Sequence, residues 1–229
     1  MWNLNKFIIV ILLSLSAGAN AQTALIFDSP NLIAFQSRSG VYGYYRAEAE
    51  NFSCYFLFYK SELESDFKGG EKSSFNINTF ILGDKSLAFS ERDSSFDVAG
   101  HIYVDLDEWI INTQQEPPGC GTAAGGFTRP AHDIYAAKYN VIKRIPAIGI
   151  RVVKGPSHFY SERNGVFVKR SGHLVKSDSV LVLQKRGMYS YILFPDVNFT
   201  GPSSTAGPFA SGWIHTSDLV DPFPLAKKQ

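Results

Sequence analysis

The stretch SCYFLFYK, residues 53–60, alternates between two sets of bulky side chains. An extended chain points successive side chains to opposite faces, so each set shares one face. The first face carries Cys54, Phe56 and Phe58, and the second carries Tyr55, Leu57 and Tyr59. Aromatic residues in a period-two pattern favour a β-strand. We therefore predict a strand here, with large side chains on both of its faces.

Comparable runs recur between clusters of Gly, Pro, Asn, Asp and Ser, a spacing typical of mainly β proteins. They include HIYVDL (101–106), VLVLQK (180–185) and MYSYILF (188–194). One segment, residues 130–145, has apolar residues at roughly helical spacing and favours a modest helix. The expected fold class is therefore mainly β, with one helix over 130–145.

Composition and charge limit the classes of function. The chain has 229 residues, of which 45% are hydrophobic, and this is enough for one or two globular domains. Its 22 basic and 21 acidic residues give a formal net charge of +1. No overall field attracts the chain to nucleic acid, so we expect no nucleic-acid partner.

The first 21 residues have the pattern of a cleaved signal peptide. Lys6 precedes an apolar run over residues 7–15, and small residues lead to the expected cleavage point after Ala21. That run is too short to span a bilayer comfortably. We therefore expect a periplasmic or secreted protein without stable membrane insertion.

The chain has two cysteines, Cys54 and Cys120. In an oxidising compartment two cysteines usually pair, so a disulfide is the expected arrangement, and two free thiols are the alternative. In the chain-entropy model, closing a loop of this length stabilises a protein by about 4 kcal/mol, less any strain.

The composition also indicates how the exported chain is divided. A cluster of Pro and Gly near residues 146–149 predicts a boundary, with an N-terminal β domain over 22–146 and a second domain over 147–221. Residues 222–229 are predicted to form a frayed tail, because their prolines prevent ladder hydrogen bonds.

Four segments follow one another in the second domain: SHFYSERNG (157–165), LVKSDSVLVL (174–183), MYSYILF and SGWIHTSDL (211–219). Their order resembles bacterial Src-homology-3-like domains, with a tyrosine-bearing segment, a Leu-Val-Lys-Gly-Asp-like turn, a valine strand, an aromatic strand and a final Gly-Trp-Ile. Ser177 stands where glycine is common, and Tyr189 stands where tryptophan is frequent. The resemblance implies a small C-terminal barrel that binds a protein or a cell-wall ligand.

Aromatic residues are the candidate ligand-binding groups of this barrel, namely Tyr160, Tyr189, Tyr191 and Trp213. Alternation in MYSYILF places Tyr189 and Tyr191 on the face opposite Ile192. Trp213 follows Gly212, which permits close chain approach, and is expected to begin the strand that closes the barrel. Its indole either packs in the barrel or serves as a platform for a ligand. Barrel packing is likewise the alternative for the three tyrosines.

The N-terminal domain is similar in style to small exported barrels such as periplasmic lysozyme-inhibitor-like proteins. The similarity depends on Gly40 and Tyr42 in a Gly-x-Tyr opening, on alternating strands and on a Cys-Gly pair at Cys120. It implies a cystine-linked β domain and carries over no inhibitory motif.

The sequence matches known catalytic and cofactor-binding motifs poorly. GCGTAAGGF (119–127) lacks the spacing of a phosphate-binding loop, and the five histidines are dispersed, so we expect no cofactor and no metal. His132 with Asp133, and the acidic cluster DLDEW (105–109), are the weaker alternatives for acid–base chemistry.

These patterns together predict a non-enzymatic, exported binding protein of the bacterial envelope that recognises a protein or peptidoglycan. One alternative is an inhibitor or immunity protein that blocks a secreted cell-wall hydrolase. Another is an uncharacterised hydrolase.

Overall fold

The computed structural model describes residues 22–49, 51–60, 72–195 and 209–225. The predicted signal peptide, residues 1–21, lies outside them. The strands are β1 (Thr23–Phe27), β2 (Leu32–Ser37), β3 (Gly40–Ala49), β4 (Phe52–Lys60), β5 (Lys72–Phe80), β6 (Val98–Asp105), β7 (Glu108–Thr113), β8 (Ala137–Pro146), β9 (Gly149–Val153), β10 (Ser157–Arg163), β11 (Val166–Leu174), β12 (Ser179–Arg186), β13 (Tyr189–Pro195), β14 (Phe209–His215) and β15 (Leu219–Val220). The short helices are η1 (Phe89–Glu91), η2 (Ser94–Phe96), α1 (Cys120–Ala123) and η3 (Thr216–Asp218). The predicted mainly β class is confirmed.

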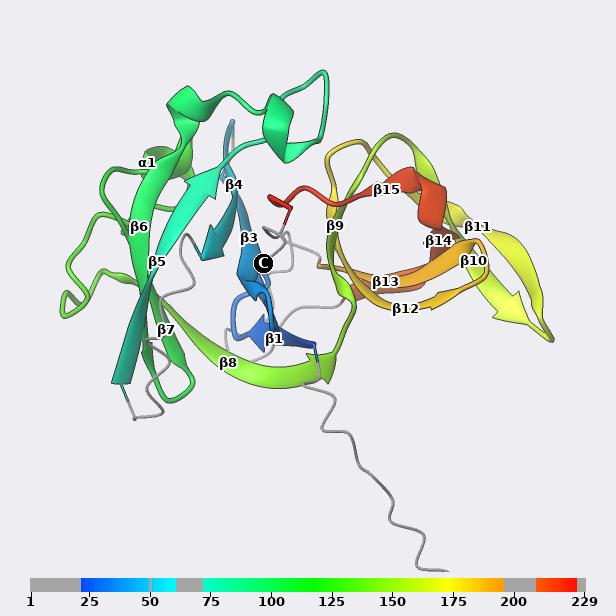
Figure 1. The fold of residues 1–229 in the computed structure, drawn as a ribbon, viewed down its shortest axis with the longest axis horizontal. Coiled ribbons are helices and arrows are strands. Elements are labelled where there is room, and N and C mark those ends of the chain that lie inside the picture. Colours follow the sequence, from blue (N-terminus) through cyan, green and yellow to red (C-terminus); the bar gives the residue numbers. More distant parts are fainter. Residues whose placement is uncertain (1–21, 50, 61–71, 196–208, 226–229) are drawn as a thin grey trace, which may run out of the picture.

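Strands β1 to β8 form a closed barrel, which occupies the left half of Figure 1. Each strand pairs antiparallel with the next in sequence, and β8 returns to pair with β1 from Thr23↔Pro146 to Phe27↔Val141. Closure leaves no unpaired edge in this sheet. The barrel is therefore a self-contained sheet, and its interior is filled by side chains.

The disulfide ties the short helix α1 to the barrel wall. Cys54 on β4 is bonded to Cys120, the first residue of α1, across a sequence separation of 66 residues. Both cysteines are fully buried in the core that fills the barrel. The predicted disulfide is therefore confirmed, and a bond of this kind is typical of proteins from oxidising compartments.

The remaining strands form a second, curved sheet in the order β11-β10-β14-β13-β12-β9-β15. Strand β14 lies between β10 and β13, so the last long strand is central to the sheet. Trp213 is the fifth residue of β14, which corrects the expectation that it begins that strand. A separate apolar core fills the concave side and contains Val153, Phe159, Leu174, Val180, Val182, Ile192 and Ile214.

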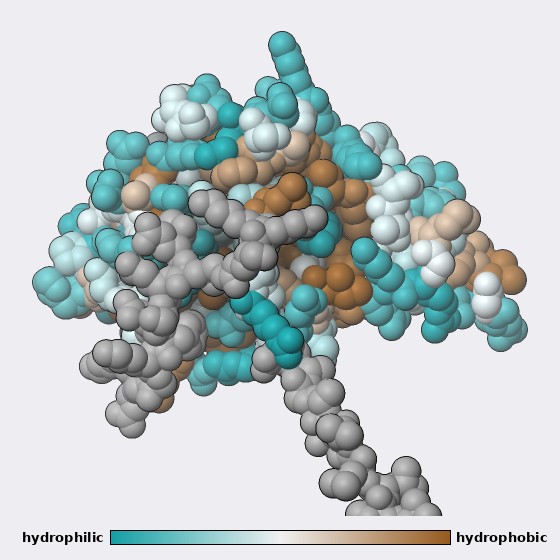
Figure 2. All heavy atoms as spheres, in the orientation of Figure 1, coloured by the Kyte–Doolittle hydropathy of each residue, from teal (hydrophilic) through white to brown (hydrophobic). Residues whose placement is uncertain are grey.

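The barrel and the second sheet share a third apolar core. Tyr44 on β3 and Leu57 on β4 point outward from the barrel and are buried against residues of the second sheet. The same cluster contains Ile150, Val152, Leu181 and Phe223. Figure 2 shows apolar surface along the junction between the two units. The outer face of β3 and β4 is therefore an internal surface of the molecule.

Polar contacts accompany this apolar junction. Arg46 on β3 pairs with Asp178, which precedes β12, at 3.2 Å, and the Tyr55 hydroxyl lies 3.1 Å from Oγ of Ser179. Burial raises the pKa of Tyr55 to about 12, and it raises the pKa of Tyr44 further. The barrel therefore contacts the second sheet through neutral phenols and one ion pair as well as apolar side chains.

The helix predicted over residues 130–145 is wrong. Strand β8 occupies Ala137–Pro146, and its buried residues Ala137, Tyr139 and Val141 alternate with exposed ones. Ile134, an apolar residue of the predicted helix, is exposed. This segment therefore follows the period-two alternation of a strand. As a strand, β8 pairs with both β7 and β1, and this pairing closes the barrel.

The frayed tail predicted from residue 222 is also wrong for its first residues. Phe223 is buried in the shared core, with its ring 4.9 Å from that of Tyr42 and 6.1 Å from that of Phe80. Prolines do exclude this segment from the ladders. A single aromatic side chain nevertheless fixes it, because its burial compensates for the missing hydrogen bonds. Residues 226–229 lie outside the described part of the chain.

Gly43 on β3 is a site where the barrel core tolerates no side chain. A Cβ atom there would lie 2.1 Å from Cζ of Phe58 and 2.8 Å from the carbonyl oxygen of Ile33. We expect Gly43→Ala to destabilise the protein by about 1–3 kcal/mol through overpacking, measured by urea unfolding. Gly155→Ala is the matched control, because its Cβ meets no atom within 4 Å. Equal stability of the two variants would contradict the packing described.

The buried phenols predict a loss of stability at alkaline pH. The pKa of Tyr55 is raised from 10.0 to about 12, so its contribution is complete below pH 10 and is lost as the pH rises toward 12. This contribution is at most about 3 kcal/mol. Tyr55→Phe should therefore reduce the fall in urea midpoint between pH 8 and 11, whereas Tyr135→Phe, at an exposed tyrosine, should leave it unchanged. The same fall in both variants would contradict this assignment.

Candidate functional site

Cross-strand register brings the predicted aromatic residues onto one face of the second sheet. Tyr160 on β10 and Tyr191 on β13 both pair with Trp213 on β14, and Tyr189 pairs with His215. Paired residues in an antiparallel sheet point to the same side. Ile192 and Ile214 point to the opposite, buried side. The four candidate residues therefore form one surface on the convex side of the sheet.

The rings of this surface contact one another. Tyr160 lies 5.3 Å from Tyr189 and 5.1 Å from His215, and Tyr191 lies 5.3 Å from Trp213, measured between ring centroids. Phe167 on β11 stacks on Tyr189 at 3.9 Å. We call these six residues, Tyr160, Phe167, Tyr189, Tyr191, Trp213 and His215, the aromatic face.

Exposure differs within the aromatic face. Trp213 is only 6% exposed, because Phe167, Tyr191 and the guanidinium of Arg186 lie over or beside its indole. The other five rings are half-buried. Trp213 therefore acts mainly as the packing centre of the face, and the tyrosines, Phe167 and His215 present the accessible ring surface.

Sequence analysis missed Phe167, His215 and Arg186. Phe167 belongs to the β10–β11 hairpin, which projects from the sheet in Figure 1. Its position opposite Glu162 follows from the Asn164-Gly165 turn, where both residues have positive φ, as a two-residue hairpin favours. An Asn-Gly pair between two strands is a signal that the sequence does contain. His215 belongs to the same alternating set as Trp213.

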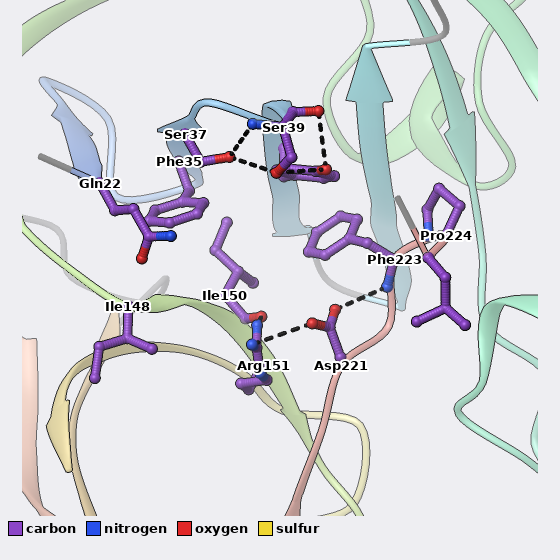
Figure 3. Close-up of a pocket in the computed structure, with 12 residues that line it drawn as sticks. Gln22, Phe35, Ser37, Ser39, Ile148, Ile150, Arg151, Asp221, Phe223 and Pro224 are labelled. Atoms are coloured by element: carbon purple, nitrogen blue, oxygen red, sulfur yellow. Dashed lines mark hydrogen bonds and ion pairs between the residues drawn. The ribbon is translucent and has the colours of Figure 1, made fainter. Parts of the chain in front are cut away.

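A second candidate site is a cavity of about 210 Å³ at the junction of the two units, drawn in Figure 3. Strands β2 and β3 supply one wall, and β9 with the C-terminal segment supplies the other. Its apolar lining includes Phe35, Ile148, Ile150 and Phe223. The cavity forms only where the two walls meet, so no pattern within one segment of the sequence could predict it.

Polar groups lie at two sides of this cavity. On one side Arg151 pairs with Asp221 at 3.1 Å and donates from Nη1 to the carbonyl oxygen of Ile150 at 2.7 Å. On the other, Oγ of Ser37 and of Ser39 lie 2.7 Å apart, and the Tyr42 hydroxyl donates to Ser39. The cavity therefore combines an apolar centre with charged and hydroxyl-bearing margins.

Two of the weaker acid–base candidates, Asp133 and Asp107, have structural partners. Cys120 is bonded to Cys54 and carries no free thiol. Asp133 accepts a hydrogen bond from the backbone of Tyr135, and Asp107 pairs with Arg144 at 2.6 Å. Among the described residues, no cluster of three or more His, Cys, Asp or Glu side chains is arranged to hold a metal ion.

The part of the chain that the structure describes has no helix with the length and hydropathy needed to cross a bilayer. Comparisons of the chain with protein-family models, with curated proteins and with solved structures found no match.

The two faces of β13 predict opposite mutational responses. Ile192 is fully buried in the core of the second sheet, so Ile192→Ala should destabilise the protein by about 2–5 kcal/mol. Tyr191 is half-buried on the aromatic face, and Tyr191→Ala should cost less than half as much. Urea unfolding of both variants measures the difference. A larger loss for Tyr191→Ala would show that the two faces have been assigned the wrong way round.

Proposed function

We propose that this chain is an exported, non-enzymatic binding protein of the bacterial envelope, and that the aromatic face recognises peptidoglycan. The observation that carries the proposal is the gathering of six aromatic or imidazole rings from four strands onto one face. Five of these rings keep part of their surface accessible. Ring faces of this kind stack on the flat apolar sides of sugars, while phenol and imidazole groups hydrogen-bond to hydroxyls.

Charged residues beside the rings suit a ligand that carries carboxylates, as peptidoglycan peptides do. Register places Lys169 opposite Tyr160 and Arg186 opposite Tyr189, on the same side as the rings. Arg186 pairs with Glu162 at 2.7 Å, and Lys169 is exposed. Because Glu162 balances the charge of Arg186, Lys169 is the cation that favours an anionic ligand, and this favours cell-wall material over a neutral glycan.

The resemblance of residues 147–221 to bacterial Src-homology-3-like domains supports the same proposal, since that family binds protein or cell-wall ligands. Export follows from the N-terminal pattern and is supported by the disulfide.

A role as inhibitor of a cell-wall hydrolase is the second candidate, and one observation favours it. Ile134 and Tyr135, adjacent in the segment before β8, are 80% and 71% exposed on the barrel. Exposed neighbouring apolar side chains are typical anchors of protein interfaces. They lie on the unit that is similar to lysozyme-inhibitor-like proteins, away from the aromatic face.

Sedimentation with purified peptidoglycan tests the main proposal. The wild-type protein should sediment with the wall, and Tyr191→Ala should weaken this binding about tenfold while the fold is kept. Tyr135→Ala is the matched control, because it removes an exposed tyrosine from the barrel and should leave wall binding unchanged.

Two results would reject peptidoglycan as the ligand. One is wild-type protein that stays in the supernatant, and the other is equal wall binding by the Tyr191→Ala and wild-type proteins. A different result would favour the inhibitor role. In that case the wild-type and Tyr191→Ala proteins would capture a hydrolase from envelope extract, and Tyr135→Ala would not.

A further inference from the structure

We propose that the cavity at the junction of barrel and second sheet binds one amino-acid residue with an apolar side chain and a free carboxylate. The source is either a free amino acid or the last residue of a peptide. The residues that carry this inference are Phe35, Ile150, Arg151, Asp221 and Phe223, all of which line the cavity. None belongs to the aromatic face, so the inference stands apart from the proposed function.

The size of the cavity restricts the ligand. Its volume is about 210 Å³, and sites for drug-sized ligands typically occupy about 300–1,000 Å³. A nucleotide or a disaccharide is too large to be enclosed, whereas one amino-acid residue fits. The cavity is also partly open to solvent, and one of the residues that line it, Leu225, is 93% exposed. The rest of a peptide chain therefore has a way out.

The centre of the cavity is apolar. Figure 3 shows Phe35, Ile150 and Phe223 turned toward the same space from β2, β9 and the C-terminal segment. These three side chains belong to the shared core and are 1–8% exposed, so each turns only a small part of its surface to the cavity. An apolar side chain placed against them is removed from water, and this drives binding.

Arg151 supplies unused hydrogen-bond donors at one margin. A guanidinium has five N–H groups, and the contacts of Arg151 within the described residues are one hydrogen bond to Ile150 and one ion pair with Asp221. Asp221 holds Arg151 in place through Oδ2 and accepts from the backbone N–H of Phe223 through Oδ1 at 3.2 Å. The remaining N–H groups of Arg151 suit a carboxylate of the ligand, and the remaining lone pairs of Asp221 can accept from its nitrogen.

The opposite margin offers acceptors. The hydroxyls of Ser37, Ser39 and Tyr42 are linked to one another at the turn between β2 and β3. A hydroxyl that donates one hydrogen bond still has lone pairs that can accept another. The amino or amide nitrogen of the ligand fits this side. Carboxylate, nitrogen and side chain of one residue thus each meet a matching part of the cavity.

Ligand titrations followed by NMR of the ¹⁵N-labelled full protein test the inference. Phenylalanine and Gly-Gly-Phe are the probes, and phenylalaninamide is the matched compound without a carboxylate. We expect at least one probe to bind with a Kd of about 1 mM or tighter, and phenylalaninamide to bind at least about tenfold more weakly. Binding by the tripeptide alone identifies a peptide end as the source, and binding by phenylalanine alone identifies a free amino acid. No shift with either probe at about 10 mM would overturn the proposal.

Four substitutions separate this site from general effects. Arg151→Gln should weaken binding of the carboxylate probe at least about tenfold, and Arg151→Lys should retain part of it. Arg144→Gln is the matched control, because Arg144 is also paired with an aspartate, Asp107, but lies on the barrel away from the cavity. Tyr191→Ala should leave probe binding intact, so a failure of this inference is distinguishable from a failure of wall recognition.

Ile148→Trp gives an independent result if Arg151→Gln does not fold. Ile148 is half-buried and lines the cavity, so a larger side chain should fill the space and block the probe without a change in charge. Melting temperatures of all variants establish that they are folded. Wild-type affinity in a folded Arg151→Gln or Ile148→Trp protein would overturn the proposal.

Discussion

The structure depends on a wall that is buried on both sides. On β4, Cys54, Phe56 and Phe58 fill the barrel, while Leu57 between them is buried against the second sheet. On β3, Tyr45 points into the barrel and Tyr44 points out of it, and both are buried. A strand normally turns one face to water when its sheet is antiparallel. Here the second sheet takes the place of water, so the two units cannot separate without exposing a set of large apolar and aromatic side chains.

This shared wall also positions both candidate sites. The cavity exists because β2 and β3 of the barrel face β9 and the C-terminal segment across the junction, where Phe223 fixes that segment. The aromatic face lies on the same outer side of the second sheet, farther along β13 and β14, since these strands turn Ile192 and Ile214 inward and their aromatic residues outward. The sequence alternation that makes the core therefore also makes the ligand-facing surface, on strands whose orientation is held by the junction.

Local sequence patterns correctly predicted those features that depend on neighbouring residues alone. Strict alternation identified β4 and the two faces of β13, and two cysteines in a chain predicted to be exported were enough to predict their bond. The wrong predictions concern segments whose structure depends on contacts with residues far away in the sequence. Residues 137–146 form a strand because barrel closure needs one, although their apolar residues also fit a helix. Phe223 is held by rings far away in sequence, and the cavity is lined by four separate segments of the chain. No single stretch contains that information.

Native-state hydrogen exchange at increasing urea concentration tests the shared wall most directly. If the barrel and the second sheet depend on one junction, their slowest-exchanging amides open in a single event. The amides of Phe56 and Leu57 in the barrel should then have the same opening free energy and the same urea dependence as those of Leu181 and Ile192 in the second sheet. Amides of the second sheet that open at a clearly lower free energy, while the barrel stays protected, would contradict this account.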